Sequence, residues 1–372
     1  MAQLLGFVSL IILQGFVILG KSNTLRSRAL FLCLSGLEIF LIMGLRSINV
    51  GPDTPTYYMV FWGISQFPDI MQFISGMESG YLLFNHILSY FTKNPQVFFM
   101  ISAAIIVYSG MWLVYKNSPY VCLSVLIYIA LGQMAFDMAG MRQALAAAVL
   151  FFAFGFLIKK NIIMYLFCVF LASAFHESAL FFLAAYPLMK LDLNLKTLTF
   201  IFIVTTGAFL LFTSFTNLMF YLIPKYASYG HSFYFEREAK LASYFKTLIA
   251  FAVFFFAYWA YAFNREKCKL LDAQSRLRIR LLLYFSLITA CVLLISIRAT
   301  IIERLALYFS FFNIITIPIA LSLISNRKIR ILSACTIVAM SLTYMIVVNT
   351  LRPEWWKVLP YEFFWQTTTY MM

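Results

Sequence analysis

Charge is scarce in this chain of 372 residues. Only 11% of the residues are charged, against about 25% in a soluble domain, whereas 63% are hydrophobic. A water-soluble fold cannot cover that much apolar surface, but a bilayer solvates it. Hydrocarbon offers the backbone no hydrogen bonds, so only helices and closed barrels cross it. Because the apolar runs are long and do not alternate with polar residues, the composition predicts an all-α polytopic membrane protein.

Metal-binding and nucleotide-binding motifs are also missing. The three histidines and six cysteines are dispersed and form no CxxC pair, so we expect no metal site. No P-loop, GxGxxG, HExxH or nucleophile-elbow motif occurs, which weighs against an ATP-driven pump, a nucleotide enzyme or a zinc peptidase. The net charge of +14 does not indicate nucleic acid, because Lys and Arg gather in short loops between apolar runs. We therefore expect no cofactor and no nucleic-acid partner.

The apolar runs set the number of spans. Candidate spans cover residues 2–20, 29–45, 97–115, 119–136, 141–158, 162–186, 198–223, 247–263, 281–297, 304–324 and 331–350. The shorter stretch 79–92 fits a span, a re-entrant helix or an interfacial helix. The prediction is a transmembrane helical bundle of about 10 to 12 spans, forming a single integral membrane domain over residues 1–372.

The basic loops predict the orientation. Most positive charge lies in Lys21–Arg28, Arg265–Arg280 and Asn326–Arg330, which the positive-inside rule places in the cytoplasm. The loop at about 46–78 then faces the extracytoplasmic side. The aromatic tail after Asn349 suits the membrane–water interface. The rule does not decide the side of Arg142, because that depends on whether 79–92 spans.

The most distinctive loop runs from Arg46 through Gly51-Pro52-Asp53-Thr54 to Tyr57. An arginine ends a span, and a tight turn presents an aspartate. One interpretation is a simple capping loop. The other is a carboxylate held at the membrane surface, beside an arginine that grips a phosphate or carboxylate in bidentate fashion.

Further charged residues interrupt apolar segments. Arg142 and Gln143 open a helix, where an arginine is favourable if an anion binds at the helix N-terminus and otherwise snorkels to the surface. His176-Glu177-Ser178 interrupts the run 162–186, and a His–Glu pair at that depth favours function. Arg298 and Arg304, with Glu303, fit an interhelical salt bridge or a second anion site. Glu78 opens the segment 79–92 as a helix cap or as part of a polar cleft.

Together these residues resemble the EpsG-like family of Wzy O-antigen and exopolysaccharide polymerases. The resemblance is carried, in the family's order, by Arg46…Gly51-Pro52-Asp53-Thr54…Tyr57, Glu78-Ser-Gly80-Tyr81…Asn85, Arg142-Gln143-Ala-Leu-Ala146, Phe175-His176-Glu-Ser178-Ala179 and Arg304…Tyr308. The first element is fairly specific. The others are individually weak, and they are informative because they occur in the family's order. They span residues 46–308, and the region after about 310 adds nothing diagnostic.

The resemblance implies a glycosyltransferase of the bacterial inner membrane that works at the periplasmic face in lipopolysaccharide or exopolysaccharide biosynthesis. It would join undecaprenyl-diphosphate-linked oligosaccharide repeat units, without nucleotide sugar or metal, with a possible chain-length regulator as partner. It also favours an extracytoplasmic Arg142, in one cleft with Asp53.

Roles for the candidate residues follow from this chemistry. Arginines would stabilise the leaving diphosphate, with Arg142 joined by Arg46 or Arg304, and either Asp53 or His176 would act as general base. The remaining substrate-binding candidates are Arg298, Gln143, Tyr57 and Glu78. The alternatives are an O-antigen ligase, and a transporter or flippase of lipid-linked sugars, although paired discontinuous helices in two related halves are not evident in the sequence.

Overall fold

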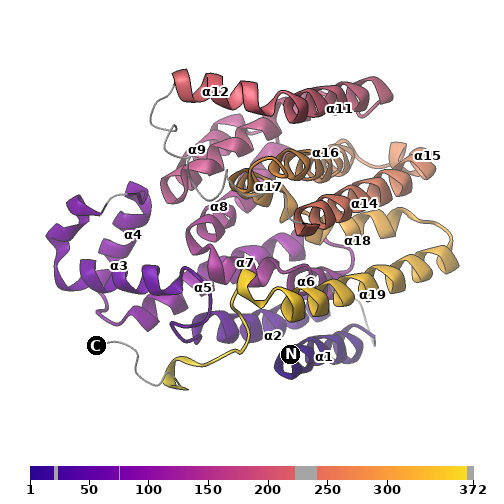
Figure 1. The fold of residues 1–372 in the computed structure, drawn as a ribbon. Coiled ribbons are helices and arrows are strands. Elements are labelled where there is room, and N and C mark those ends of the chain that lie inside the picture. The colour runs from indigo at the N-terminus through magenta and orange to yellow at the C-terminus, as the bar shows by residue number, and fades with distance from the viewer. Residues whose placement is uncertain (21–23, 75, 223–240, 367–372) are drawn as a thin grey trace. The chain divides into compact units, whose positions relative to one another are not determined.

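The computed structural model describes residues 1–20, 24–74, 76–222 and 241–366. Regular structure in these residues is helical, without β-strands, and one isolated antiparallel bridge joins Arg46 to Phe363. The ribbon in Figure 1 is accordingly built of helices and their connections. The predicted class of a polytopic all-α membrane protein is confirmed.

Seven helices of the described chain are long and apolar enough to cross a bilayer. They are α1 (Ala2–Leu19), α2 (Leu25–Gly44), α5 (Pro95–Asn117), α8 (Met141–Ile158), α14 (Leu241–Phe263), α16 (Ala273–Ser296) and α19 (Arg327–Leu351). Three pairs of shorter helices pass the same test together but are bent by 54°, 69° and 52°. These pairs are α6 (Val121–Ala130) with α7 (Gln133–Ala139), α11 (Leu195–Leu210) with residues 212–218 of α12 (Phe212–Leu222), and η4 (Thr300–Ile302) plus α17 (Glu303–Ser310) with α18 (Asn313–Leu323). Counting each pair as one span gives 10, the lower end of the predicted range.

Polar caps explain where many helices begin. The side chain before the first turn accepts a hydrogen bond from a backbone N–H of that turn, which would otherwise lack a partner. This holds for Thr24, Asn94, Asn161, Asn194, Asp272 and Asn326, each directly before the helix that it caps. Glu38, inside α2, accepts a hydrogen bond from Gln14 of α1, which supplies the partner that a carboxyl group at that depth requires.

One predicted span is wrong, and one predicted loop contains helices of its own. The expected single span 162–186 is interrupted: α9 (Ile162–Phe175) ends at His176, and η2 (Glu177–Ala184) and α10 (Ala185–Lys190) follow. The expected loop at 46–78 is largely helical, with α3 (Thr54–Gln66) and η1 (Pro68–Phe73). The next helix, α4 (Ser79–Ser89), has 11 residues. It reaches about 16 Å, roughly half of the hydrocarbon core, so it does not cross the membrane alone.

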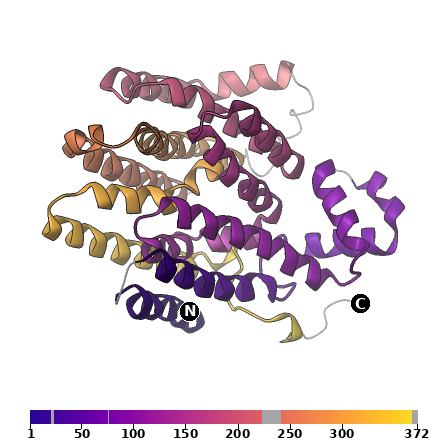
Figure 2. The same ribbon diagram turned by 180° about the vertical axis from the view of Figure 1, so that it is seen from behind.

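The chain divides into two compact units. The first contains residues 1–156, 160–180 and 326–372, and the second contains residues 157–159 and 181–325. In the first unit α2 packs along α5, as Figure 2 shows, while α1 contacts α2 and α6. Helix α3 packs on α4, and α4 on α9. That these units act as one membrane domain stays a prediction.

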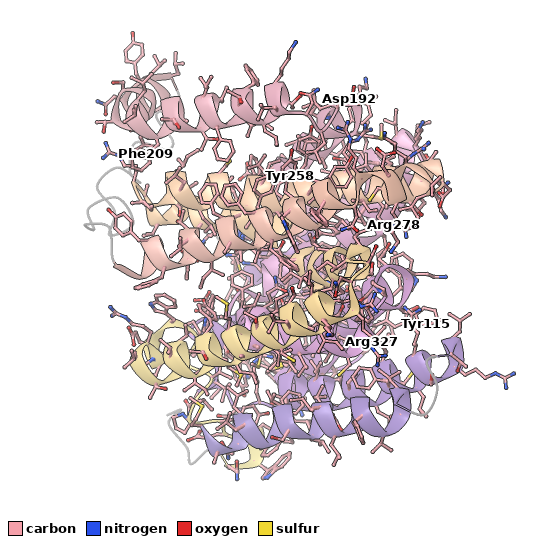
Figure 3. The ribbon with its side chains drawn as sticks, turned by 90° about the vertical axis from the view of Figure 1, so that its right-hand side faces the viewer. Tyr115, Asp192, Phe209, Tyr258, Arg278 and Arg327 are labelled. Atoms are coloured by element: carbon pink, nitrogen blue, oxygen red, sulfur yellow. The ribbon has the colours of Figure 1, made fainter. Side chains whose placement is uncertain are left out.

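The second unit is organised around α16, which contacts α14, α17, α11 and α10. Four rings fill its core with centroids 5.0–5.8 Å apart: Phe182, Phe285, Phe309 and Phe312. In Figure 3, Phe209 of α11 lies at the opposite end of this unit from Asp192 and Arg278. The unit also contains α12, α18 and the short helices α15 (Arg265–Lys269) and η4 (Thr300–Ile302).

Candidate functional site

The predicted Gly-Pro-Asp turn is present and fixes the start of α3. Gly51 has φ +97°, and a Cβ there would lie 2.7 Å from Thr54 Oγ1 and 3.3 Å from the Met138 carbonyl oxygen. Only glycine fits this conformation and this space. The Thr54 hydroxyl donates to the Val50 carbonyl at 2.7 Å, which closes the turn. Asp53 then precedes α3 as an exposed residue.

Tyr57 connects this turn to Arg142. It lies one helical turn after Asp53 and is 4% exposed. Its hydroxyl group interacts with the Arg142 side chain. Burial, followed by the charge of Asp53, raises the pKa of the Tyr57 phenol. The phenol therefore stays neutral and keeps its proton for a hydrogen bond.

A second fixed contact brings Glu78 to His176. A Cβ on Gly80 would lie 2.6 Å from both the Cβ and the carbonyl oxygen of Ala174. Glycine is therefore required for α4 to approach α9 this closely. Glu78 is the residue before α4, and His176 is the residue after α9. The close packing of the two helix ends places these two polar residues side by side.

Glu78 is the centre of the resulting cluster. Its Oε2 lies 2.6 Å from Arg142 Nη1, and its Oε1 accepts the backbone N–H of Glu177 at 3.1 Å. The same Oε1 is 3.8 Å from His176 Nδ1. Arg142 also donates to the Gly76 carbonyl oxygen at 3.3 Å. With side chains 19%, 19% and 14% exposed, Glu78, Arg142 and His176 are screened from bulk water yet reachable.

His176 occupies a break between two helical segments. Its backbone is extended (φ −156°, ψ 116°), so the residue belongs to neither α9 nor η2. His176 Nδ1 lies 2.8 Å from Ser178 Oγ, and Gln143 Nε2 donates to the same Oγ at 3.4 Å. Non-helical backbone at such a break is where membrane proteins build polar sites. We call Glu78, Arg142, Gln143, His176 and Ser178 the polar cluster.

Arg46 is placed differently from the expectation that it meets substrate at the surface. It is 2% exposed, and its guanidinium donates to the carbonyl oxygens of Met43 and Met138. The guanidinium also lies 4.9 Å from the centre of the Phe99 ring. Burial lowers the pKa of Arg46 to about 10, so it remains charged at neutral pH. These contacts describe an arginine that ties α2, α5 and α7 together.

Arg298 and Arg304 belong to the second unit. Arg298 is exposed, with its guanidinium 5.4 Å from the centre of the Phe209 ring. Arg304 is exposed at the start of α17, where the neighbouring Glu303 forms an ion pair with Lys246. Their role as a second anion site stays a prediction.

Sequence reasoning missed two members of this region. Ser178 was part of the His176 motif but carried no assigned role, although its hydroxyl group is a hydrogen-bond partner of the imidazole. Tyr81 is fully buried, and the Arg142 guanidinium lies 6.0 Å from its ring centre. The sequence signal that could have identified both is their position, since Tyr81 lies in the motif that contains Glu78 and Ser178 in the motif that contains His176. Among the described residues no group of three His, Cys, Asp or Glu side chains could hold a metal ion.

The polar cluster combines a cation, a carboxylate and an imidazole in one partly screened site. The arginine suits the binding of an anion, and the imidazole beside a carboxylate suits the transfer of a proton. Both functions are available within the first unit alone.

Comparison with known proteins gives a family. No curated protein and no solved structure matches the chain. The EpsG family, a family of polymerase-like membrane proteins, matches residues 29–363 and so covers all the motifs from Arg46 to Tyr308. The chain is therefore a multi-pass membrane protein that belongs to the EpsG family.

Proposed function

We propose that this protein is a Wzy-type polysaccharide polymerase. It joins undecaprenyl-diphosphate-linked oligosaccharide repeat units by glycosyl transfer. The observation that carries the proposal is the polar cluster, in which Glu78 links the Arg142 guanidinium to the His176 imidazole. A lipid diphosphate leaving group needs a cation, and a sugar hydroxyl nucleophile needs a base. Membership of the EpsG family supports the same reaction class.

In this reaction the acceptor hydroxyl oxygen attacks the anomeric carbon of the donor glycan. The bond between that carbon and the diphosphate oxygen breaks, and both electrons leave with the lipid diphosphate. Arg142 stabilises the negative charge that develops on the diphosphate. Its position at the start of α8 adds the favourable end of the helix dipole.

The acceptor proton passes to His176. The imidazole is held at Nδ1 by Ser178, and the Glu78 carboxylate 3.8 Å away favours the protonated ring that forms during transfer. Asp53 is the second candidate for this role, from the exposed turn before α3. The two candidates are separated by the substitutions described in the Discussion.

The same proposal places the protein in the bacterial inner membrane, with the polar cluster facing the periplasm. Arg142 contacts Glu78 and Gly76, so it belongs to the same face as the segment 46–78. That segment lies opposite the basic stretches Arg265–Arg280 and Asn326–Arg330 in the predicted orientation. Membrane lipids surround the apolar helices, and a chain-length regulator protein is a further proposed partner.

Two experiments test the proposal against its rivals. The first experiment deletes the gene. If the protein is a polymerase, the deletion strain carries single repeat units on its lipid A core. If it is an O-antigen ligase, the core is bare. Purified protein in liposomes, supplied with lipid-linked repeat units, is expected to form new glycosidic bonds. Movement of the lipid-linked sugar across the bilayer without elongation would identify a flippase and overturn the proposal.

A further inference from the structure

The segment that follows α19 returns to the end of α2. It comprises residues 352–366, with η5 (Pro353–Trp355) and η6 (Phe364–Gln366), and we call it the strap. Figures 1 and 2 show it leaving α19 and passing along the first unit as the last, yellow part of the described chain. The sequence predicts only an aromatic tail for the membrane interface. The structure gives the strap a specific partner, the stretch Leu45–Gly51.

Backbone hydrogen bonds join the strap to this stretch along its length. Phe364 N–H donates to the Leu45 carbonyl oxygen at 2.9 Å, and Ser47 N–H donates to the Glu362 carbonyl oxygen at 2.8 Å. These two bonds flank the antiparallel bridge between Arg46 and Phe363. Such pairing fixes the register of the two segments, as it does for neighbouring strands in a sheet.

Further contacts extend the pairing on both sides. Gly51 N–H donates to the Lys357 carbonyl oxygen at 3.0 Å. The Glu362 carboxylate accepts from the Asn49 amide at 3.3 Å, and the Tyr361 hydroxyl donates to the Ile42 carbonyl oxygen at 2.7 Å. Burial raises the pKa of the Tyr361 phenol, which therefore keeps the proton that it donates.

Trp356 anchors the strap to the rest of the first unit. Its ring packs edge-on against Phe136 of α7 at 5.7 Å. Its indole nitrogen lies 3.6 Å from the point where a Cβ on Gly132 would stand, at the bend between α6 and α7. The strap thus contacts the bent helix pair α6–α7 on one side and the stretch before α3 on the other.

This arrangement makes the strap part of the candidate site's support. Gly51 is the last residue that the strap holds, and its left-handed turn determines where α3 begins. Asp53 precedes α3, and Tyr57, one turn later, contacts Arg142. A displaced Gly51 would move all three groups relative to one another.

We propose that the strap is a positioning element of the polymerase site, which fixes Leu45–Gly51 and thereby places Asp53 and Tyr57 beside Arg142. The inference rests on the proposed function for its activity readout. Its geometric content, the attachment of residues 352–366 to Leu45–Gly51, is independent of that function.

Truncation gives the first test. A chain that ends at Leu351 keeps α19 but lacks the strap, whereas a chain that ends at Gln366 keeps it and serves as control. We expect the shorter chain to reach the membrane but to elongate lipid-linked repeat units with kcat lowered at least about 10-fold and KM little changed, because misplacement of reacting groups slows the chemical step. The control is expected to match the full chain.

A milder variant guards against loss of folding in the truncated chain. Phe364→Pro removes the one backbone N–H that donates to Leu45 and leaves the remaining strap in place. Phe364→Ala is the matched control, because it loses the same side chain but keeps the backbone N–H that donates to Leu45. A lower kcat for Phe364→Pro alone supports positioning, and equal kcat for both variants and the full chain contradicts it.

A reversible cross-link separates a positioning element from a lid that opens. One backbone hydrogen bond joins Phe364 to Leu45, and opposed Cα atoms of paired strands lie about 5.5 Å apart, which is within reach of a disulfide. With Leu45→Cys and Phe364→Cys combined, oxidation is expected to restore the kcat that the reduced double variant loses. Activity that disappears on oxidation would show that the strap must open and would overturn the proposal.

The failure of the proposed function is distinguishable from the failure of this inference. If the full chain does not elongate lipid-linked units at all, the function is wrong, and thiol labelling still tests the strap. In a background without the six native cysteines, the Asp53→Cys thiol is expected to react with a charged maleimide at a different rate once the strap is removed. An unchanged rate, or no disulfide between positions 45 and 364, would refute the positioning role.

Discussion

The Glu78 carboxylate and the Arg142 guanidinium, 64 positions apart in the chain, form an ion pair of 2.6 Å. Each side chain is 19% exposed, so the pair is partly removed from water. The candidate diphosphate-binding cation therefore carries its own counter-ion. An incoming diphosphate must share Arg142 with Glu78 or displace it, and a released Glu78 lies next to His176. In the proposed reaction, anion binding and proton transfer would thus be linked through one carboxylate.

Removing the charge of Glu78 tests this link. Glu78→Gln keeps the shape of the side chain but leaves Arg142 without its counter-ion and His176 without its carboxylate. We expect elongation to fall by about 100-fold or more, since acid–base contributions are of that size. The measurement is the rate of repeat-unit addition by purified protein. Glu177→Gln is the matched control, because that adjacent side chain is exposed, and an equal loss in both variants would argue against a specific role for Glu78.

Gly80 tests the packing that assembles the cluster. Gly80→Val places atoms where Ala174 already stands, so α4 must move away from α9. We expect a loss of about 1–3 kcal/mol in the free energy of unfolding, as for other overpacked sites, together with slower elongation. Gly110→Ala in α5 has open space around its Cβ and is expected to be neutral or slightly stabilising. Thermal unfolding in detergent, read beside activity, compares the two.

A substitution of Arg46 tests whether this arginine stabilises the fold or binds substrate. Arg46→Lys keeps a positive charge but loses the planar group that donates to the Met43 and Met138 carbonyls. We expect unfolding to become easier by about 1–3 kcal/mol, because these buried acceptors lose their partner. If Arg46 instead serves only to bind diphosphate, the lysine variant should keep its melting temperature and change KM for the lipid-linked donor.

The general base is tested by substitution at both candidate positions. His176→Ala is expected to lower kcat by about 10²- to 10⁴-fold, whereas Asp53→Asn is expected to have a smaller effect through Tyr57 and Arg142. Chain length of the polysaccharide in complemented cells gives a first reading, and initial rates with purified protein give the second. The larger loss in Asp53→Asn would transfer the base role to that carboxylate, and full-length chains from both variants would exclude either as base.

Much of the fold could be predicted because it depends on composition and local pattern. Apolar runs set the long helices, polar caps set their starts, and Gly51 revealed the turn before α3. The break at His176 could not be predicted, since no glycine or proline marks it. The break lies beside a tertiary contact that no local pattern reveals, the close approach of Gly80 in α4 to Ala174 near the end of α9.

The site was predictable as a set of residues but not as a set of contacts. Arg142, His176 and Glu78 all lie in motifs visible in the sequence, and the structure brings them together in one unit. The central place of Glu78 depends on pairing across the chain, which no local pattern reveals. Arg46 illustrates the converse: a charge at the end of a span indicated the surface, whereas the strap and α7 bury it.

The most direct test of the proposed polymerase is elongation by purified protein in liposomes with a defined undecaprenyl-diphosphate-linked repeat unit. The number of repeat units per lipid is counted by mass spectrometry for the full chain and for Arg142→Ala. We predict a ladder of elongated products from the full chain, without added nucleotide sugar, and unreacted single units from Arg142→Ala. Single units from both proteins, or an equal ladder from both, would contradict the account.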